Sequence, residues 1–232
     1  MEGSIFTQKE LKEIGTKTVD LVMAAIDAGD MEKAKKLSGA LHREFLAMHD
    51  LYVDWVASLL TFIYRKYGDA ALYDALKETY GEVVKQTIGM YAQEKDMRRK
   101  VQLFARGLKG HLESVRIEED DEKFTFVVDP CGSGGRLARR GGYEPPMNLA
   151  KVKRAQHMTL GRKDFPIYCC HALFQEMAAI EMTGKPWIIE DPPPNIGKEP
   201  CRIYMYKDTA EVPEKWYRRI GKKKGKVKQA NK

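Results

Sequence analysis

The spacing of hydrophobic residues changes once along this 232-residue chain, near residue 113, and that change constrains the fold most. Upstream, apolar residues recur every three or four positions, the period of a helix that buries one face. Downstream, Val115, Ile117, an acidic turn and the run over 123–128 predict a β-hairpin. We therefore predict an α+β protein in which a helical N-terminal half packs on a small antiparallel sheet.

Four helices are predicted in the first half, over about 8–28, from the forties into the sixties, over 70–91 and over 96–111. Thr7 and Glu10 have the spacing of a capping box that opens the first helix. The second helix is predicted to close at Tyr67 and Gly68, and a break near Asp50 is left open as an alternative to a continuous helix. Its apolar residues recur at helical spacing: Leu41, Phe45, Met48, Tyr52, Trp55, Leu59 and Phe62. No internal repeat and no coiled-coil heptad of useful length is evident.

The second half alternates short strands with loops and one interposed helix. That helix is predicted over 168–183, after Asp164 and Pro166 and before Gly184. Strands are predicted over 187–190 and 201–206, separated by a proline-rich loop. The predicted organisation is a helical region over 1–113, a cysteine-containing α/β region over 114–208 that holds the site, and a basic tail over 209–232.

The net charge of +7 comes from the C-terminal tail. Residues 217–232 contain eight Lys and Arg and no acid, which leaves about −1 for the remainder. A basic tail can contact phosphates only weakly and without sequence preference, so nucleic acid is not the expected partner. No apolar run approaches the roughly 20 residues of a membrane span, and no secretory signal opens the chain. These features predict a cytoplasmic protein without a membrane partner.

Cysteine is absent from the first 130 residues and then occurs at Cys131, Cys169, Cys170 and Cys201. In a reducing cytoplasm these residues are not expected to form structural disulfides. The alternatives are core thiols, metal ligands and a reactive nucleophile.

The helix predicted from residue 168 arranges several of these groups by its 100° step. Cys170 falls in the middle of the apolar arc and is interpreted as a core thiol. Cys169 and Glu176 fall together at the edge of the arc, as a pair that could face a catalytic site. His171 falls on the opposite edge, as a solvated histidine. Glu181 falls inside the arc, where it is either a catalytic acid or base or a carboxylate that reaches the surface.

The segment around Cys131 is rich in glycine. Its backbone N–H groups could turn toward one point and form an anion-binding nest. The predicted ligand-binding residues are Gly132, Ser133, Gly134, Gly135 and Arg136. Cys131 at the mouth of the nest would be favoured as a thiolate. The spacing matches neither nucleotide-binding glycine motif, so no nucleotide is predicted. The alternative is an ordinary glycine-rich turn.

Sulfur and imidazole ligands suggest a metal site for zinc or iron. The predicted ligands are Cys131, Cys169 and Cys201 with His171; Cys170 and His157 are possible substitutes. A second hypothesis is a metal-free nucleophile, Cys131 or Cys169, with a histidine or Glu176 beside it. A third is that the thiols only pack.

Four segments, 169–176, 183–184, 187–191 and 197–204, together with the order of elements, resemble a known group of proteins. This group joins vinyl-reductase-type domains with L-2-amino-thiazoline-4-carboxylate hydrolase-like proteins, and the resemblance covers roughly residues 110–208. It implies a small α/β domain that binds a compact ligand. Cys201 matches the cysteine that begins the last strand in this group. The preceding strand departs from the pattern, because Ile189, Glu190 and Asp191 stand where a cysteine is common.

The function predicted from these features is a hydrolase or lyase that acts on a small sulfur- or nitrogen-containing acid. The catalytic candidates are Cys131, Cys169, Glu176 and Glu181. The alternatives are a ligand sensor of the vinyl-reductase type, without turnover, and an assembly subunit. The long amphipathic N-terminal helices predict a homodimer.

Overall fold

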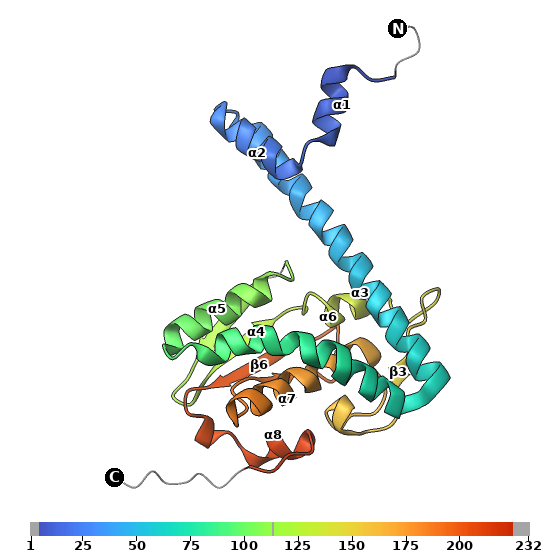
Figure 1. The fold of residues 1–232 in the computed structure, drawn as a ribbon, viewed down its shortest axis with the longest axis vertical. Helices are drawn as coiled ribbons and strands as arrows, with labels where there is room; N and C mark the ends of the chain where they lie inside the picture. The colour runs from blue at the N-terminus through green and yellow to red at the C-terminus, as the bar shows by residue number, and fades with distance from the viewer. Residues whose placement is uncertain (1–4, 113, 225–232) are drawn as a thin grey trace. The chain divides into compact units, whose positions relative to one another are not determined.

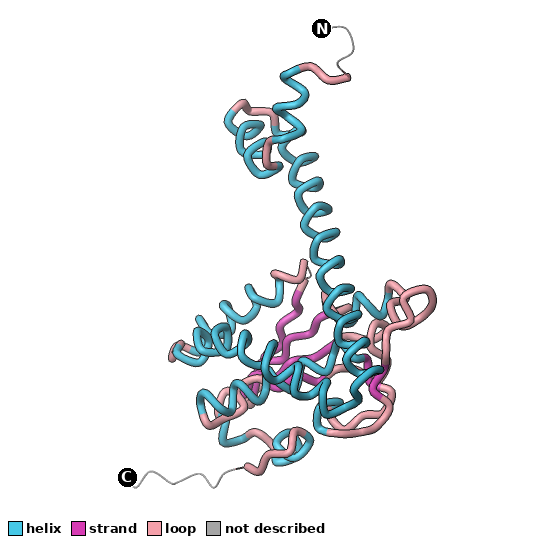
Figure 2. Tube along the Cα trace, turned by 45° about the vertical axis from the view of Figure 1, so that its right-hand side comes forward, coloured by secondary structure: helices cyan, strands magenta, loops and turns pink. Residues whose placement is uncertain are grey.

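The computed structural model describes residues 5–112 and 114–224 (Figures 1 and 2). Two compact units divide the chain, Met1–Leu51 and Tyr52–Lys232. The boundary lies inside a helix, far upstream of the change at residue 113, because the later helices pack on the sheet.

The first unit contains helix α1 (Gln8–Gly15), helix α2 (Thr18–Asp27) and the start of helix α3 (Met31–Leu76). The capping box is confirmed, since Thr7 Oγ1 accepts the Glu10 N–H and Glu10 accepts the Thr7 N–H at 2.7 Å. The single helix predicted over 8–28 is wrong. Thr16 and Lys17 have ψ values of 137° and 135°, and this extended backbone separates α1 from α2.

Helix α3 begins earlier than predicted and has no break at Asp50. Its regular geometry is interrupted at Gly68, where φ is +82°, a value that favours glycine. A π-helical turn, η1 (Lys77–Gly81), then leads into α4 (Glu82–Gln93). Helix α5 (Met97–Lys109) follows, and the Asp96 carboxylate caps it by accepting the Arg98 N–H at 2.9 Å.

The sheet has four strands in the order β1 (Val115–Glu119), β2 (Lys123–Val128), β6 (Cys201–Tyr206) and β5 (Ile189–Asp191). Every pair is antiparallel. Helix α7 (Ala172–Thr183) precedes β5 in the chain and lies beside α4 (Figure 1). The predicted α+β fold, with helices packed on an antiparallel sheet, is confirmed.

One buried core cluster of the larger unit lies between the sheet and helices α4, α5 and α7. Phe126 and Met205 of the sheet, Ala179 of α7 and Phe104 of α5 belong to one buried cluster. Phe104 meets Phe126 edge to face, with ring centroids 4.9 Å apart. This ring contact fixes helix α5 against the hairpin of β1 and β2. The register of the sheet decides which residues meet where β2 ends and β6 begins.

Short elements complete the larger unit: α6 (Gly134–Arg139), β3 (Lys151–Val152), 3₁₀ helix η2 (His157–Thr159), β4 (Phe165–Pro166), η3 (Ile167–His171), η4 (Thr209–Glu211) and α8 (Glu214–Arg219). The segment predicted as a basic tail is therefore partly folded. Tyr217 of α8 is buried, because it packs in a small cluster with Ile189 and Tyr206. Residues 225–232 lie outside the described part of the chain.

One helical run, residues 31–93, is long and apolar enough by length and composition to cross a membrane. Only 22% of its most apolar window is buried. The cytoplasmic location stays a prediction.

A cysteine-lined candidate active site

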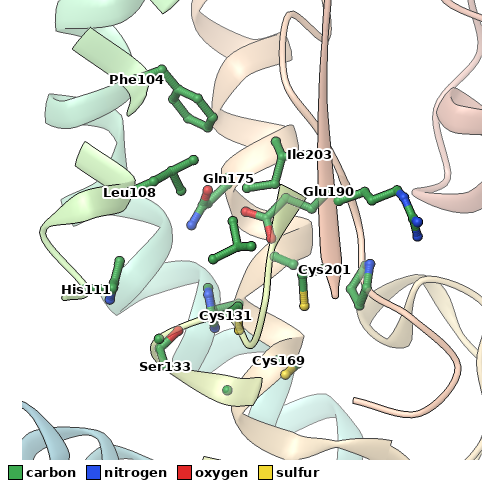
Figure 3. Close-up of a pocket in the computed structure, with 17 residues that line it drawn as sticks. Phe104, Leu108, His111, Cys131, Ser133, Cys169, Gln175, Glu190, Cys201 and Ile203 are labelled. Atoms are coloured by element: carbon green, nitrogen blue, oxygen red, sulfur yellow. The ribbon is translucent and has the colours of Figure 1, made fainter. Parts of the chain in front are cut away.

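A cavity of about 110 Å³ opens at the end of the sheet where β2 stops and β6 begins (Figure 3). Its volume is close to the roughly 150 Å³ that holds a benzene-sized molecule in an engineered protein cavity. One part of the lining is apolar and the other carries thiols and a carboxylate. The lining residues on which the argument depends are Phe104, Leu108, Cys131, Cys169, Glu190 and Cys201.

The register of the sheet brings two of the cysteines together. Val128, the last residue of β2, pairs with Cys201, the first residue of β6. The turn that follows β2 carries Cys131 back over this end of the sheet. The Cys201 thiol hydrogen-bonds to the sulfur of Cys131. Residues 70 positions apart in the chain thus meet because their strands are neighbours.

The glycine-rich turn surrounds the sulfur of Cys131 with donors. The Gly135 N–H donates to Cys131 Sγ at 3.0 Å, and Ser133 contributes a backbone and a side-chain hydrogen bond. The Cys201 hydrogen bond and these donors lower the pKa of Cys131 below its ordinary value, although burial opposes them. Two residues of the predicted nest, Ser133 and Gly135, therefore form hydrogen bonds with the Cys131 sulfur, and binding of an external anion by the nest stays a prediction.

The pKa values of the two neighbouring thiols, Cys169 and Cys201, are raised rather than lowered. The hydrogen bond to Cys131, burial and the nearby charges raise the pKa of Cys201. Burial and the adjacent Cys131 raise the pKa of Cys169. Of these three thiols, Cys131 is therefore the one whose environment most favours the thiolate, the reactive form of cysteine.

Glu190 of β5 supplies the carboxylate of the cavity, and Figure 3 shows its side chain pointing inward. Burial raises its pKa to about 7, the Cys131 charge adds to this shift, and Arg219 opposes it. A carboxyl group with a pKa near 7 can both donate and accept a proton at neutral pH.

Arg219 of α8 holds the strand that carries Glu190. Its guanidinium bonds the carboxylate of Glu176 and donates to the Glu190 carbonyl at 2.6 Å. The Glu190 N–H donates to Glu176 Oε1 at 2.7 Å. Burial raises the pKa of Glu176 to about 8, with Arg219 opposing the shift. This buried pair has a positioning role behind β5.

The imidazole of His171 and the amide of Gln175 also belong to the lining of the cavity. His171 is half-buried, its Nδ1 lies 2.6 Å from the Tyr168 carbonyl oxygen, and burial lowers its pKa. The Gln175 amide donates to the Tyr80 hydroxyl. Both His171 and Gln175 line the cavity. The interpretation of His171 as a solvated histidine is therefore wrong.

The predicted pair of Cys169 and Glu176 does not face one site. Cys169 lies in the 3₁₀ turn before α7, so the 100° step of an α-helix does not extend to it. Cys169 lines the cavity, whereas Glu176 is fully buried against Arg219. Cys170 is buried in the core, as predicted.

Other predicted site residues lie away from the cavity. Glu181 is exposed and forms an ion pair with Lys85 at 3.3 Å, so of its two interpretations the surface one holds. Among the described residues, Gly132, Ser133 and Gly134 line the cavity, whereas Gly135 and Arg136 do not. His157 lies against Arg219 O at 3.0 Å instead.

Sequence reasoning missed Glu190, the carboxylate of the site. A signal was present, since Glu190 follows three apolar residues in a short predicted strand and precedes a proline-rich loop. An acid in a buried strand is costly unless it has a function or a partner.

The metal ligands proposed from the sequence, Cys131, Cys169, His171 and Cys201, all line this cavity. Within the described ranges, however, no group of three or more His, Cys, Asp or Glu side chains is arranged to hold a metal ion. Binding of zinc or iron stays a prediction.

Close packing at Gly134 gives a stability prediction. A Cβ at this position would lie 2.5 Å from Cys169 Sγ, so Gly134→Ala must displace α6 or the thiol. We expect the free energy of unfolding to fall by about 1–3 kcal/mol in urea denaturation. Gly81→Ala is the control, since the nearest atoms to its Cβ, Leu76 O and Phe174 Cδ1, would both lie at 3.6 Å, an ordinary contact distance. Equal stability of the two variants would contradict this packing.

No protein family, curated protein or solved structure matches this chain in the comparisons. The resemblance to vinyl-reductase-type and thiazoline-carboxylate hydrolase-like proteins therefore stays an expectation.

Proposed function

We propose that this protein is a cysteine-dependent hydrolase of a small carbon–nitrogen substrate, with Cys131 as the nucleophile and Glu190 as the acid and base. The observation that carries the proposal is the environment of the Cys131 sulfur. It accepts hydrogen bonds from Gly135, Ser133 and Cys201 at the wall of a cavity that also contains Glu190. A thiol that only packs needs none of these donors.

The chemistry follows in two steps. The Cys131 thiolate adds to the electrophilic carbon, the carbon–nitrogen bond breaks, and neutral Glu190 protonates the leaving nitrogen. Glu190, now a carboxylate, then takes a proton from the water that attacks the thioester. The acid product leaves, and Cys131 returns to the thiolate and Glu190 to the neutral acid.

The cavity restricts the substrate to a compact molecule. Phe104, Leu108 and Ile203 line its apolar part, and the thiols and Glu190 lie in its polar part. A ring or short chain with one reactive carbon–nitrogen bond suits this division. The resemblance noted in the sequence points the same way, toward a small sulfur- and nitrogen-containing acid.

The test is a panel of small thiazoline and amide carboxylates, incubated with the protein and quenched in acid. We expect product release with at least one compound, and an acyl group on the Cys131 peptide in mass spectra. Tight binding without product would favour the alternative of a ligand sensor, for which the apolar part of the cavity is the supporting observation.

Elemental analysis of protein purified without chelator tests the hypothesis that the site binds zinc or iron. One equivalent of zinc or iron, lost in both Cys131→Ser and Cys201→Ser, would replace thiolate attack by metal-activated water.

A further prediction concerns Cys201. Cys201→Ala removes the thiol that hydrogen-bonds to the Cys131 sulfur, so the pKa of Cys131 rises. A hydrogen bond to a charged group is worth about 1.5–3 kcal/mol, and S–H is a weak donor, so we expect a rise of about one pH unit. The pH dependence of iodoacetamide alkylation of Cys131 measures it. Cys201→Ser, which keeps a donor, should show a smaller rise, and an unchanged profile in both variants would contradict the assignment.

A further inference from the structure

Helix α3 carries apolar side chains that nothing in the described chain covers. In the larger unit, Tyr52, Trp55, Leu59 and Phe62 are 48–58% exposed. We call these four residues the α3 surface. The other side of the same helix packs on the core through Val53, Ala57 and Leu60, which are buried. A helix that is apolar on both sides is normally covered on both sides.

The spacing of the α3 surface is that of a helix pair. Its residues are separated by three, four and three positions, the 3.5-residue period of a coiled-coil seam. Upstream, Leu41, Phe45 and Met48 continue the same spacing and are also exposed. The repeat lasts about three heptads, between Ser38 and Lys66, which is short for a coiled coil.

The first unit, Met1–Leu51, buries too little apolar surface within itself to be stable alone. Among its described residues, only Ala25 and Ala34 are buried apolar residues. Two alanines bury far too little apolar area to offset the conformational entropy of some 50 ordered residues. Helices α2 and α3 of this unit require apolar cover from outside the unit.

We propose that the α3 surface binds the α3 helix of a second copy of this chain. A 3.5-residue seam interdigitates with a helix that has the same repeat, and a two-fold axis pairs a surface with itself. Within the described chain, α3 is the one helix that combines this repeat with exposure. Helix α5 turns Phe104 into the core, and α1 and α2 have 8 and 10 residues.

The available area agrees with a stable dimer. Tyr52, Trp55, Val56, Leu59, Phe62 and Tyr67 are each about half exposed, which presents roughly 600 Å² at about 200 Å² for a large side chain. A standard interface buries about 800 Å² per partner, of which somewhat more than half is apolar. The larger unit's part of α3 therefore presents by itself about the apolar area that such an interface needs.

A lipid bilayer is a poorer occupant. Any stretch of about 20 residues that includes 51–64 contains Asp54 and also Asp50 or Arg65. Asp54 already pairs with Arg140 at 2.7 Å. A charged residue at the centre of a membrane helix costs about 2.5–3.5 kcal/mol.

The experiment measures mass by light scattering at about 10 µM for the full chain. We expect the wild type at twice the 26.5 kDa of one chain and Trp55→Lys/Leu59→Lys at 26.5 kDa. The matched control is Val83→Lys/Met90→Lys, which replaces two apolar residues of similar exposure on α4 and should stay dimeric. Far-UV circular dichroism and alkylation of Cys131 report whether each variant is folded.

A monomeric wild type, or a Trp55→Lys/Leu59→Lys variant that stays dimeric, overturns the proposal. Monomeric wild type that floats with vesicles of phosphatidylcholine and phosphatidylserine also overturns it and assigns the surface to a membrane. If the double variant does not fold, Leu59→Gln replaces it, with an expected rise of at least tenfold in the dimer dissociation constant. An unchanged dissociation constant overturns the proposal equally.

Discussion

Replacing Cys131 with serine should abolish the acyl-enzyme and lower the turnover number by a factor on the order of 10⁴ or more. The nucleophile makes the covalent bond of the acyl-enzyme, and the raised pKa values of Cys169 and Cys201 disfavour the thiolate form that could replace it. The donors of Gly135 and Ser133 act on a thiolate, and a serine hydroxyl at the same position stays protonated at neutral pH. We expect substrate affinity to change little, because the apolar lining is untouched.

Cys170→Ala is the matched control, since this thiol is buried in the core and does not line the cavity. It should keep its turnover number within a few-fold while losing some stability. Steady-state kinetics with the substrate found in the panel, and mass spectra of the quenched reaction, measure both effects. A Cys131→Ser variant with substantial turnover would exclude covalent catalysis through this residue.

Replacing Glu190 with glutamine should lower the turnover number and raise the stability of the fold above neutral pH. Turnover should fall by about 10²–10⁴, because the amide can neither protonate the leaving nitrogen nor activate water. Stability above neutral pH should rise, because the variant has no buried carboxylate to ionise. Glutamine resembles neutral Glu190 in shape, so the cavity should be preserved.

The direction of the pH effect on stability follows from the raised pKa of Glu190. Folded Glu190 keeps its proton up to a pKa of about 7, whereas the unfolded side chain releases it near 4.5. Between these values the folded state binds more protons, so the stability of the wild type falls as pH rises from about 4.5 to 7. The shift corresponds to about 2–3 kcal/mol after allowance for partial exposure.

Urea denaturation at pH 5 and pH 8 measures this difference. We expect Glu190→Gln to match the wild type at pH 5 and to exceed it by about 2–3 kcal/mol at pH 8. Glu181→Gln is the control, because this carboxylate is exposed and should leave the pH dependence unchanged. Equal pH dependence of Glu190→Gln and the wild type would show that Glu190 is ionised at ordinary pH.

Local sequence signals predicted the fold where they act within one element. The capping box at Thr7, the glycine that ends α7 at Gly184 and the hairpin of β1 and β2 all depend on neighbouring residues. The break at Thr16 and the π-turn over Lys77–Gly81 were missed although Gly15 and Gly81 mark them, because an isolated glycine also occurs inside continuous helices. The exposed side of α3 was not distinguished from a core face, since both have the same spacing.

The candidate site was predicted in part, because all its cysteines lie in the second half. The meeting of Cys131 with Cys201 depends on the β2–β6 register, which spacing along the chain does not reveal. The helical wheel misplaced Cys169 and His171, because both lie in a 3₁₀ turn. Glu190 was missed because a single acid in a short strand carries no motif.

The most direct test of the account is to find which thiol reacts first. The protein is treated with less than one equivalent of iodoacetamide at pH 6.5, digested, and analysed by mass spectrometry for each cysteine peptide. Because hydrogen bonds lower the pKa of Cys131 and burial raises those of Cys169 and Cys170, we predict that Cys131 carries nearly all the label. Label spread evenly over the four cysteines, or found mainly on Cys169 or Cys201, would contradict a Cys131 thiolate and the mechanism built on it.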